Sequence, residues 1–327
     1  MAATGVVLVT GANSGLGLVT CIALARMPGT SEIILACRSR ARAEEAIAIL
    51  VKGTSRPADF FRFLHFDSAC NDSVRSAVAS LKASNTVLDR ILLNAGGMGS
   101  REASGLTKAG STEVMAMNVV GHALFVEQLI AANLIAPGAR IIFSSSESIV
   151  GMGPFPKPTF DPPTKDTVAK HMNNTLTGQP LKWMGPGYMG VSGYGCAKAI
   201  GTMYFQHLAR LKPDVYIASV SPGATKGTGA MKSSSGWFKC LGGFLATFMM
   251  HSVEVGAQRY VDALTSETYP SDYPSGACVA SFDSEGATGK VCDYAKVDTK
   301  SKKNNTANFQ DVALQEQAYQ AVQQFFV

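Results

Sequence analysis

A glycine-rich turn directly after a short apolar segment constrains the fold of this chain more than any other feature. Residues 6–9 read Val-Val-Leu-Val, and residues 10–17 read Thr-Gly-Ala-Asn-Ser-Gly-Leu-Gly. An uninterrupted apolar run of this length is typical of a strand that is buried on both faces of a parallel sheet. Residues 16–27 then show helical spacing of apolar side chains. A strand, a tight turn and a helix in this order predict the first unit of a doubly wound α/β sheet.

The same alternation continues along the chain and defines the expected architecture. Further strands are predicted at 32–37, 60–66, 90–93, 140–143 and 216–220, and helices at 40–52, 74–84, 111–134, 194–211, 251–265 and 311–326. Strands that alternate with helices form parallel sheets with right-handed crossovers. We therefore expect one α/β domain over residues 1–327. Residues 151–192 interrupt the pattern with many Pro, Gly, Lys and Thr residues, which predicts an inserted loop.

Charge and cysteine spacing argue against several classes of protein. The chain has 327 residues with 29 basic and 24 acidic side chains, and its net charge of +5 is scattered, so no nucleic-acid partner is expected. The seven cysteines lie far apart without metal-site spacing, which predicts no metal and free thiols in a reducing compartment. The apolar run at 6–9 is too short for a secretory signal. We expect a cytoplasmic protein, or a plastid protein if the chain is a mature form without its transit peptide.

The glycine turn carries the first functional prediction. Its spacing lets the backbone approach a pyrophosphate closely, and the N-terminus of the following helix favours negative charge. A glycine turn without a ligand is the alternative, which the strand–turn–helix context disfavours. The turn residues predicted to bind a dinucleotide are Gly11, Asn13, Ser14, Gly15, Leu16 and Gly17.

The end of the second predicted strand distinguishes between the two nicotinamide cofactors. An acidic residue there would bind the ribose 2′-hydroxyl and repel a 2′-phosphate, but this chain has Cys37-Arg38-Ser39-Arg40. Arg38 offers a permanently charged, planar fork that suits phosphate, and Arg40 is placed to assist. We therefore predict NADPH (NADP+) as the cofactor. Asp67, at the end of the third strand, is either an acceptor for the adenine amino group or a cap of the following loop.

A second motif lies far downstream of the glycine turn. Tyr194 and Lys198 are four residues apart in a predicted helix, so a phenol and an ammonium lie on one helical face. A free phenol has a pKa near 10, and a nearby ammonium favours its ionised form. The pair therefore predicts proton transfer to a substrate oxygen near neutral pH. Taken alone, Tyr194 would more often be a half-buried packing residue.

The order of the motifs resembles that of the short-chain dehydrogenase/reductase family. The series is Thr-Gly-x-x-x-Gly-x-Gly, Asn-Ala-Gly, Asn, Ser, Tyr-x-x-x-Lys and Pro-Gly, and it covers about residues 5–265. The resemblance implies a Rossmann fold with a doubly wound, parallel, seven-stranded sheet, and an NADP-dependent oxidoreductase. It implies that Tyr194 is the general acid and that Lys198 binds the nicotinamide ribose and lowers the phenol pKa. It also implies that Ser146 hydrogen-bonds the substrate oxygen and that Asn118 holds a water in the proton relay.

The resemblance also implies which serine belongs to the site and which further residues contact the cofactor. Ser146 is preferred over Ser145, because the family's serine follows the second position of this strand-end run. The remaining cofactor contacts that the resemblance implies are Asn94, Ala95, Gly96, Pro222, Gly223 and Thr228, together with Tyr194 and Lys198.

Three details resemble the branch with protochlorophyllide reductases, retinol dehydrogenases and carbonyl reductases. The segment between Ser146 and Tyr194 is much longer than in simple members, and residues 36–38 read Ala-Cys-Arg. Residues 221–229 match the protochlorophyllide reductase pattern Pro-Gly-Cys-x-x-x-Thr-Gly without gaps, except that Ala224 stands where the photoenzyme has its cysteine. A methyl group cannot donate a proton. We therefore expect a light-independent reductase, with a light-dependent protochlorophyllide reductase-type photoenzyme as the alternative.

Residues 229–250 stand where the family carries its substrate lid. Aromatic and methionine side chains at 237–250 suit a flat apolar ligand, and a closed lid would exclude water. We therefore expect a bulky hydrophobic substrate with a carbonyl group or a conjugated double bond. A core or oligomer-contact helix is the alternative for this segment, and a contact with a membrane surface or a larger assembly is a third.

The resemblance leaves the assembly open between a monomer and a homodimer. Many family members pair through the helices expected here at 111–134 and 194–211. Residues 284–327 are expected to form a C-terminal extension with a polar, loop-like first part. The rival function from another class is a non-catalytic NADPH- or pigment-binding subunit of a larger assembly.

Overall fold

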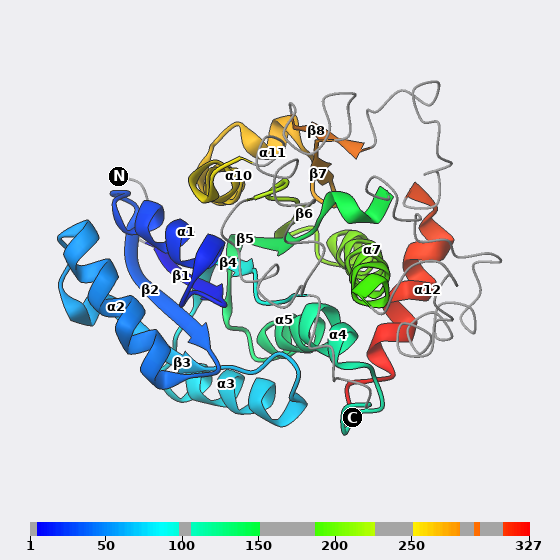
Figure 1. Ribbon diagram of the computed structural model, residues 1–327, viewed down its shortest axis with the longest axis horizontal. Coiled ribbons are helices and arrows are strands. Elements are labelled where there is room, and N and C mark those ends of the chain that lie inside the picture. Colours follow the sequence, from blue (N-terminus) through cyan, green and yellow to red (C-terminus); the bar gives the residue numbers. More distant parts are fainter. Residues whose placement is uncertain (1–4, 98–105, 151–186, 226–250, 282–290, 295–309) are drawn as a thin grey trace.

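The computed structural model describes residues 5–97, 106–150, 187–225, 251–281, 291–294 and 310–327 (Figure 1). The side chains of residues 150 and 187–193 are not described. Most of the predicted insertion at 151–192 therefore lies outside the described residues. The predicted lid at 229–250 and Thr228 lie outside them entirely.

One sheet of eight strands forms the centre of the molecule, in the order β3-β2-β1-β4-β5-β6-β7-β8 (Figure 1). The strands are β1 (Gly5–Thr10), β2 (Thr30–Cys37), β3 (Phe61–His65), β4 (Leu88–Leu93), β5 (Ile135–Ser144), β6 (Tyr216–Val220), β7 (Cys278–Ala280) and β8 (Cys292–Asp293). Strands β1 to β7 pair in parallel, and the strand order reverses between β1 and β4. The predicted doubly wound parallel sheet is therefore confirmed.

The number of strands differs from the predicted seven. The eighth strand, β8, pairs antiparallel with β7 through Val279 with Asp293 and Ala280 with Cys292. It lies inside the region predicted as loop-like. A strand of two residues is too short to show any periodicity, so sequence patterns could not reveal it.

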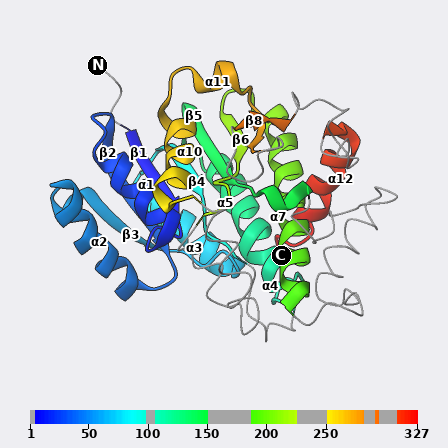
Figure 2. The same cartoon turned by 45° about the horizontal axis from the view of Figure 1, so that its top comes forward.

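Helices cover both faces of the sheet (Figures 1 and 2). The helices are α1 (Gly15–Ala25), α2 (Arg40–Thr54), α3 (Asn71–Ala83), α4 (Glu113–Met115), α5 (Gly121–Ala131), α7 (Gly187–Leu211), α10 (Val253–Thr265), α11 (Tyr269–Asp272) and α12 (Val312–Gln323). Short turns are η1 (Ala58–Phe60), η2 (Ala116–Val120) and η3 (Glu147–Val150). Helices α1, α2, α10 and α11 pack in one apolar cluster, and α3, α5, α7 and α12 pack in the other.

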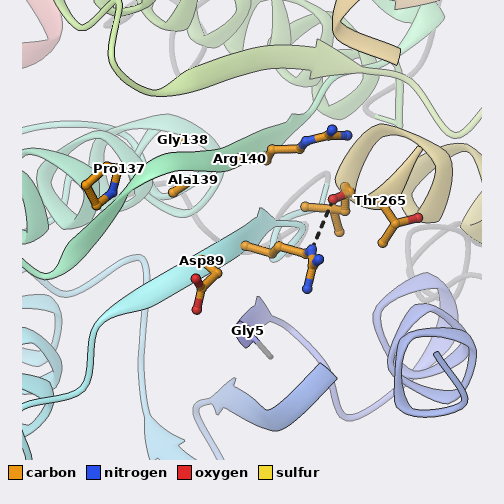
Figure 3. Close-up of a pocket in the computed structure, with 9 residues that line it drawn as sticks. Gly5, Asp89, Pro137, Gly138, Ala139, Arg140 and Thr265 are labelled. Atoms are coloured by element: carbon orange, nitrogen blue, oxygen red, sulfur yellow. Dashed lines mark hydrogen bonds between the residues drawn. The ribbon is translucent and has the colours of Figure 1, made fainter. Parts of the chain in front are cut away.

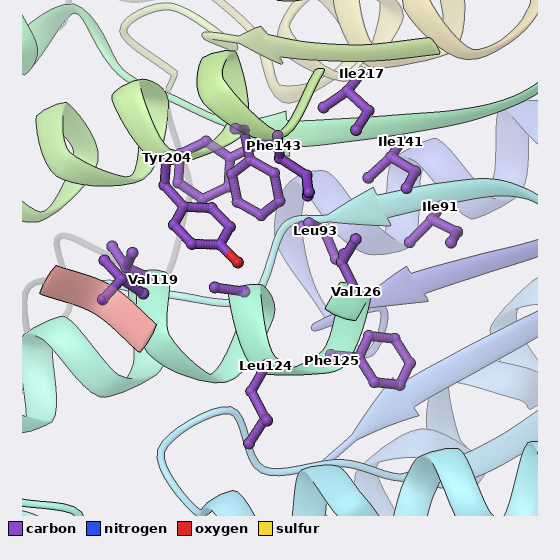
Figure 4. Close-up of a cluster of buried hydrophobic side chains, with 14 of the residues drawn as sticks. Ile91, Leu93, Val119, Leu124, Phe125, Val126, Ile141, Phe143, Tyr204 and Ile217 are labelled. Atoms are coloured by element: carbon purple, nitrogen blue, oxygen red, sulfur yellow. The ribbon is translucent and has the colours of Figure 1, made fainter. Parts of the chain in front are cut away.

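The apolar strands supply both clusters because their side chains alternate between the two faces. On β1, Val7 and Val9 belong to the cluster with α1, and Leu8 belongs to the cluster with α5 and α7. Figure 4 shows the second cluster, where Phe143 of β5 lies close to the side chains of α5 and α7. Burial on both faces explains why these strands read as continuous apolar runs.

The single helix predicted at 111–134 is divided in the structure. A π-helical turn, η2, separates α4 from α5 and contains Asn118. Such turns insert one extra residue into a helix and often lie at functional sites. Residues 114–126 are nearly all apolar, so the sequence pattern did not show the inserted residue and predicted one continuous helix. The next long helix, α7, begins at Gly187 rather than at the predicted residue 194, so the end of the predicted insertion is helical.

The stretch Glu113–Ala131 is long and apolar enough to cross a membrane by length and composition. Within the molecule, however, 67% of it is buried against other elements. A core helix that packs on a sheet has the same composition.

The amino ends of the strands form the edge of the sheet away from the glycine turn. A cavity of about 270 Å³ lies there between β1, β4, β5 and the end of α10 (Figure 3). Arg90 donates to the carbonyl oxygen of Leu264, and Arg140 donates to those of Ala263 and Ser266. Two cations therefore satisfy the last carbonyl groups of α10, where the helix dipole is negative.

Candidate active site

The glycine turn joins β1 to α1 at the carboxyl edge of the sheet. Gly11 and Gly15 have φ values of 67° and 54°, in the left-handed region that favours glycine. Gly17 lies in the first turn of α1, where a Cβ atom would meet the carbonyl oxygen of Gly11 and the side chain of Asn94. The local geometry of the turn therefore requires glycine at all three positions.

The N-terminus of α1 is suited to an anion. Ser14 precedes the helix, is exposed, and makes no side-chain capping hydrogen bond. The first turn of α1 contains no acidic residue. The first N–H groups of a helix lack partners within the helix and carry partial positive charge. Asn13 lies in the same turn, and Leu16 packs against Gly256 of α10.

Side-chain hydrogen bonds tie the end of β4 to the glycine turn. Asn94 Nδ2 donates to the carbonyl oxygens of Thr10 at 3.0 Å and of Gly11 at 3.4 Å. The Thr10 hydroxyl accepts from the Ala95 amide at 2.9 Å. The predicted residues Asn94 and Ala95 therefore adjoin the glycine turn and fix its position.

Asn118, on η2, holds the loop after β4 from the other side. Its amide nitrogen donates to the carbonyl oxygens of Gly97 and Val114, both at 2.8 Å, and its Oδ1 accepts from the Gly97 amide at 3.1 Å. A Cβ atom on Gly96 would meet Asn118 Oδ1 and would lie 3.6 Å from Lys198 Nζ. The Asn118 side chain thus positions this loop beside Lys198, and its role in holding a water stays a prediction.

Tyr194 and Lys198 lie one turn apart on α7 and adjoin the end of β5. Lys198 Nζ donates to the carbonyl oxygen of Ser144 at 2.7 Å and lies 5.5 Å from the centre of the Tyr194 ring. The Ser146 side chain forms a hydrogen bond with Tyr194. The neighbouring Ser145 instead bonds to the buried Thr202 hydroxyl at 2.9 Å, so it belongs to the packing between β5 and α7.

Burial governs the ionisation of this cluster. It raises the pKa of Tyr194 to about 12, while the hydrogen bond with Ser146 acts in the opposite direction and the Glu147 carboxylate adds to the rise. Burial also lowers the pKa of Lys198 to about 7. Lys198 is not among the groups that shift the pKa of Tyr194 in the polypeptide itself, so its effect on the phenol stays a prediction. A buried amine is driven towards its neutral form, and so it offers the phenol little positive charge.

The end of β2 lies beside the glycine turn, because β2 pairs with β1 in parallel. Arg38 follows β2 directly and is exposed. Arg40 lies 4.5 Å from the centre of the Phe63 ring and forms an ion pair with Glu44 at 3.6 Å. Arg38 is therefore the better placed of the two arginines to meet a phosphate, and Arg40 packs on β3.

Asp67 lies in the loop between β3 and α3. Its Oδ1 accepts from the Ala69 amide at 3.0 Å, and its own amide donates to the Ser73 hydroxyl at 2.9 Å. The carboxylate therefore closes the loop, as one of the two alternatives for this residue predicted. Contact with an adenine stays a prediction.

Pro222 and Gly223 form the turn after β6. Gly223 has a φ of 78°, and its amide donates to the Ser221 hydroxyl at 3.2 Å. Thr225 Oγ1 donates to the Gly223 carbonyl oxygen at 3.0 Å and closes the turn. The turn lies at the same edge of the sheet as the glycine turn, because β6 runs parallel to β5 and β1.

Sequence patterns missed several polar residues around the site. His122 lies one helical turn after Asn118, and its Nε2 is 3.1 Å from the Thr10 hydroxyl. Glu147 directly follows Ser146, and its buried carboxylate lies 3.5 Å from Arg259 of α10. The sequence around Glu147 gave no local signal, because this residue stands among the serines at 144–146 and 148. Its partner lies more than a hundred positions away, which no local pattern can indicate.

The carboxyl edge of the sheet thus combines an anion-binding turn with a hydroxyl, a phenol and an amine. A phenol that is kept protonated can donate a proton, and a neighbouring hydroxyl can stabilise an oxygen that gains negative charge. In doubly wound sheets, ligands bind outside the carboxyl ends of the strands where the strand order reverses. The arrangement is therefore suited to transfer of a proton to a ligand held beside the glycine turn.

Comparisons with known proteins agree with this arrangement. The family model described as short chain dehydrogenase matches residues 5–157. The protochlorophyllide reductase of Daucus carota is 41% identical over 91 residues, which is 28% of this chain and 22% of that protein. The human WW domain-containing oxidoreductase is 34% identical over 143 residues, which is 44% of this chain and 33% of that protein. The matches thus span a third or less of these relatives.

A solved structure supports the fold over nearly the whole chain. The L-sorbose reductase of Gluconobacter frateurii, solved with NADPH and L-sorbose, has a TM-score of 0.60 and 18% identity, covering 88% of this chain and 98% of that one. At this identity the likeness concerns the fold alone. The family match, the ordered motifs and this fold make the chain similar to the short-chain dehydrogenases/reductases, a family of oxidoreductases.

Proposed function

We propose that this protein is an NADPH-dependent reductase of a bulky hydrophobic substrate that carries a carbonyl group or a conjugated double bond. One observation supports the proposal above all: Ser146, Tyr194 and Lys198 meet at the carboxyl edge, next to the turn that suits a pyrophosphate. Ser146 and Tyr194 supply the hydroxyl groups that a developing oxyanion requires.

The donor set at this edge fits NADPH. The uncapped N-terminus of α1, with Ser14 exposed, would hold the pyrophosphate, and Arg38 would hold the 2′-phosphate. The L-sorbose reductase of the same fold was solved in complex with NADPH, which is consistent with this choice. When bound, the cofactor would supply a hydride to the substrate.

The chain's own residues would handle the proton. A phenol is protonated at neutral pH, and burial favours this form further by raising the pKa of Tyr194 to about 12, so Tyr194 can donate its proton to the substrate oxygen. Ser146 would donate a hydrogen bond to the same oxygen as negative charge develops. Lys198 is anchored by the Ser144 carbonyl and would favour the phenolate that remains, since it gains positive charge more readily beside an anion.

Replacement of the phenol tests this proposal. We expect Tyr194→Phe to lower kcat for NADPH oxidation at least about 100-fold over a panel of apolar aldehydes, ketones and enones, since general acid catalysis contributes about that much. The Kd for NADPH should change little, and NADH should be a poorer cofactor. The matched control is Tyr204→Phe, which removes a hydroxyl from the same helix at a position bonded to Glu127. Equal rates for Tyr194→Phe and the control would refute the assignment of the acid.

The similarity to protochlorophyllide reductases favours a second candidate, a light-dependent reductase. Ala224 opposes it, because it stands where that pattern has a cysteine. The same panel, extended by protochlorophyllide and run in darkness and under illumination, separates the two candidates. Turnover in darkness supports the proposed function, and turnover that requires light supports the second candidate.

A further inference from the structure

A buried ion pair adjoins Ser146 and has no part in the proton transfer proposed above. Glu147 is the first residue of η3, and only 8% of its side chain is exposed. Its Oε1 lies 3.5 Å from Arg259 Nη1, and the Arg259 side chain is only 11% exposed. The pair thus joins the turn that carries Ser146 to helix α10.

Further contacts extend this pair to the ends of β6 and β7. Glu147 Oε2 accepts from the Ser221 hydroxyl at 2.5 Å, and Oε1 accepts from the Ser281 amide at 3.4 Å. Arg259 donates to the Ser221 carbonyl oxygen at 3.3 Å and to the Ser281 hydroxyl at 2.9 Å. Both charges are therefore bonded at several atoms, as a buried ion pair requires if it is to be tolerated.

The carboxylate is one of several ionisable groups that face Tyr194. From η3, Glu147 raises the pKa of Tyr194 in addition to burial. From α7, Lys198 lies 5.5 Å from the ring centre. From α10, the Tyr260 hydroxyl forms a hydrogen bond of 2.6 Å with the Ser144 hydroxyl, and Tyr194 adds to the rise of the Tyr260 pKa.

Two other ionisable groups interact with Lys198 or with Glu147 rather than with Tyr194 directly. His122 of α5 is kept neutral by burial, with the charge of Lys198 adding to the fall of its pKa. Cys278 of β7 has a raised pKa, mainly through burial, to which Glu147 also contributes. Neither group carries charge near neutral pH, so Glu147 is the anion that acts on Tyr194, and Arg259 is its countercharge.

We propose that Glu147 and Arg259 are positioning residues of the reductase, which hold the Ser146 turn in place and together set the net charge beside Tyr194. The inference rests on the proposed function. Arg259 neutralises a carboxylate that would otherwise disfavour the phenolate left after proton donation. The two residues should therefore have opposite effects on the ionisation of Tyr194, although each contributes to the same turn.

Two single variants and their combination test this. In Glu147→Gln, the alkaline pKa of kcat/KM for carbonyl reduction should fall by about 1, because removal of a nearby anion favours the phenolate. In Arg259→Gln it should rise by a similar amount, because the carboxylate loses its countercharge. In the double variant it should return towards the wild-type value. Arg259→Lys, which keeps the charge, should also stay close to wild type.

A matched control separates this effect from a general loss of an ion pair. Glu32 and Arg62 form a partly exposed pair, with Nε 2.6 Å from Oε1, between β2 and β3 at a distance from Tyr194. Glu32→Gln should leave the pH profile unchanged. Circular dichroism and NADPH binding establish that each variant is folded before its profile is interpreted.

The Tyr194 ionisation is also measured without turnover. With ¹³C-labelled tyrosine, the resonance lost in Tyr194→Phe identifies this residue, and its titration should begin at lower pH in Glu147→Gln and at higher pH in Arg259→Gln. Shifts of the same sign, or none, in folded variants overturn the inference even if the wild type reduces its substrates through Tyr194. A wild type with no Tyr194-dependent turnover but opposite NMR shifts supports the electrostatic pair and refutes only the proposed reaction.

Discussion

At the scale of single residues, burial decides which side chains are charged. His122 is fully buried, and its ring stacks on Phe66 at 6.1 Å between centres. Burial, and next the charge of Lys198, lower the pKa of His122 to about 3. An unfolded histidine titrates near 6.5, so between these values only the unfolded chain binds the proton. The stability present above pH 6.5 is therefore lost as the pH falls towards 3.

This linkage predicts that His122 is a source of acid sensitivity. The free energy of unfolding should fall by about 1.4 kcal/mol for each pH unit below about 6.5 through this group. In His122→Gln, urea unfolding should give a lower stability at neutral pH but a shallower loss on acidification. His65→Gln, at the exposed end of β3, is the control and should keep the wild-type slope. Equal slopes for wild type and His122→Gln would contradict the prediction.

At the scale of elements, the contact between β1, α1 and β4 requires the backbone of α1 to lie close to the end of β1 and to the loop after β4. We refer to this contact as the joint. Gly17 lies so near the Gly11 carbonyl and the Asn94 side chain that a Cβ atom would force one of them to move. Asn94 in turn holds the carbonyl groups of Thr10 and Gly11. A methyl group at one position should therefore disturb both the helix start and the loop after β4.

Two glycine substitutions with opposite expected effects on stability test this contact between β1, α1 and β4. Gly17→Ala should lower the stability by about 1–3 kcal/mol through overpacking, and should weaken NADPH binding as well. Gly53→Ala, on α2 where nothing lies within 4 Å of the added Cβ, should raise stability by up to about 1 kcal/mol through helix propensity. Thermal unfolding and NADPH titration of both proteins provide the measurement. An unchanged melting temperature in Gly17→Ala would show that the joint can relax.

At the scale of the whole molecule, α12 covers the helices through which many family members pair. It packs along α7 and α5, with Leu314, Ala318 and Val322 buried (Figure 1). The hydroxyls of Tyr204 and Tyr319 both donate to Glu127, at 2.9 and 2.7 Å. Since this helix of the same chain occupies that face, we expect a monomer rather than a homodimer.

The same substitution at two positions of α12 tests this expectation. Ala318→Glu places a charge in the buried interface with α7, so α12 should detach and the uncovered apolar face should cause self-association. Ala313→Glu, at the exposed start of α12, should leave the protein monomeric. Analytical ultracentrifugation measures both, with the wild type beside them. A wild-type dimer would contradict the expected role of α12.

The spacing of residues in the sequence was sufficient to predict those structural features that depend on residues close together in the chain. The apolar runs within β1, β4 and β6 predicted a parallel sheet, because strands that are buried on both faces consist mostly of apolar residues. The glycine turn and the Tyr194–Lys198 pair were recognisable because each depends on spacing within one turn or one helix. The short β8 and the π-helical turn at Asn118 were missed, because neither leaves a repeating pattern.

Only the tertiary structure decided what depends on partners far apart in the chain. It joined Glu147 to Arg259, Thr10 to His122, and the C-terminal helix α12 to α7. It also showed that burial moves the pKa of Tyr194 and of Lys198 in directions that the motif itself does not indicate. The amino-acid order thus determined the sheet and predicted which groups would react. The ionisation of these groups, and the residues that hold them in place, depend on packing, because desolvation and long-range charge pairs exist only once the chain has folded.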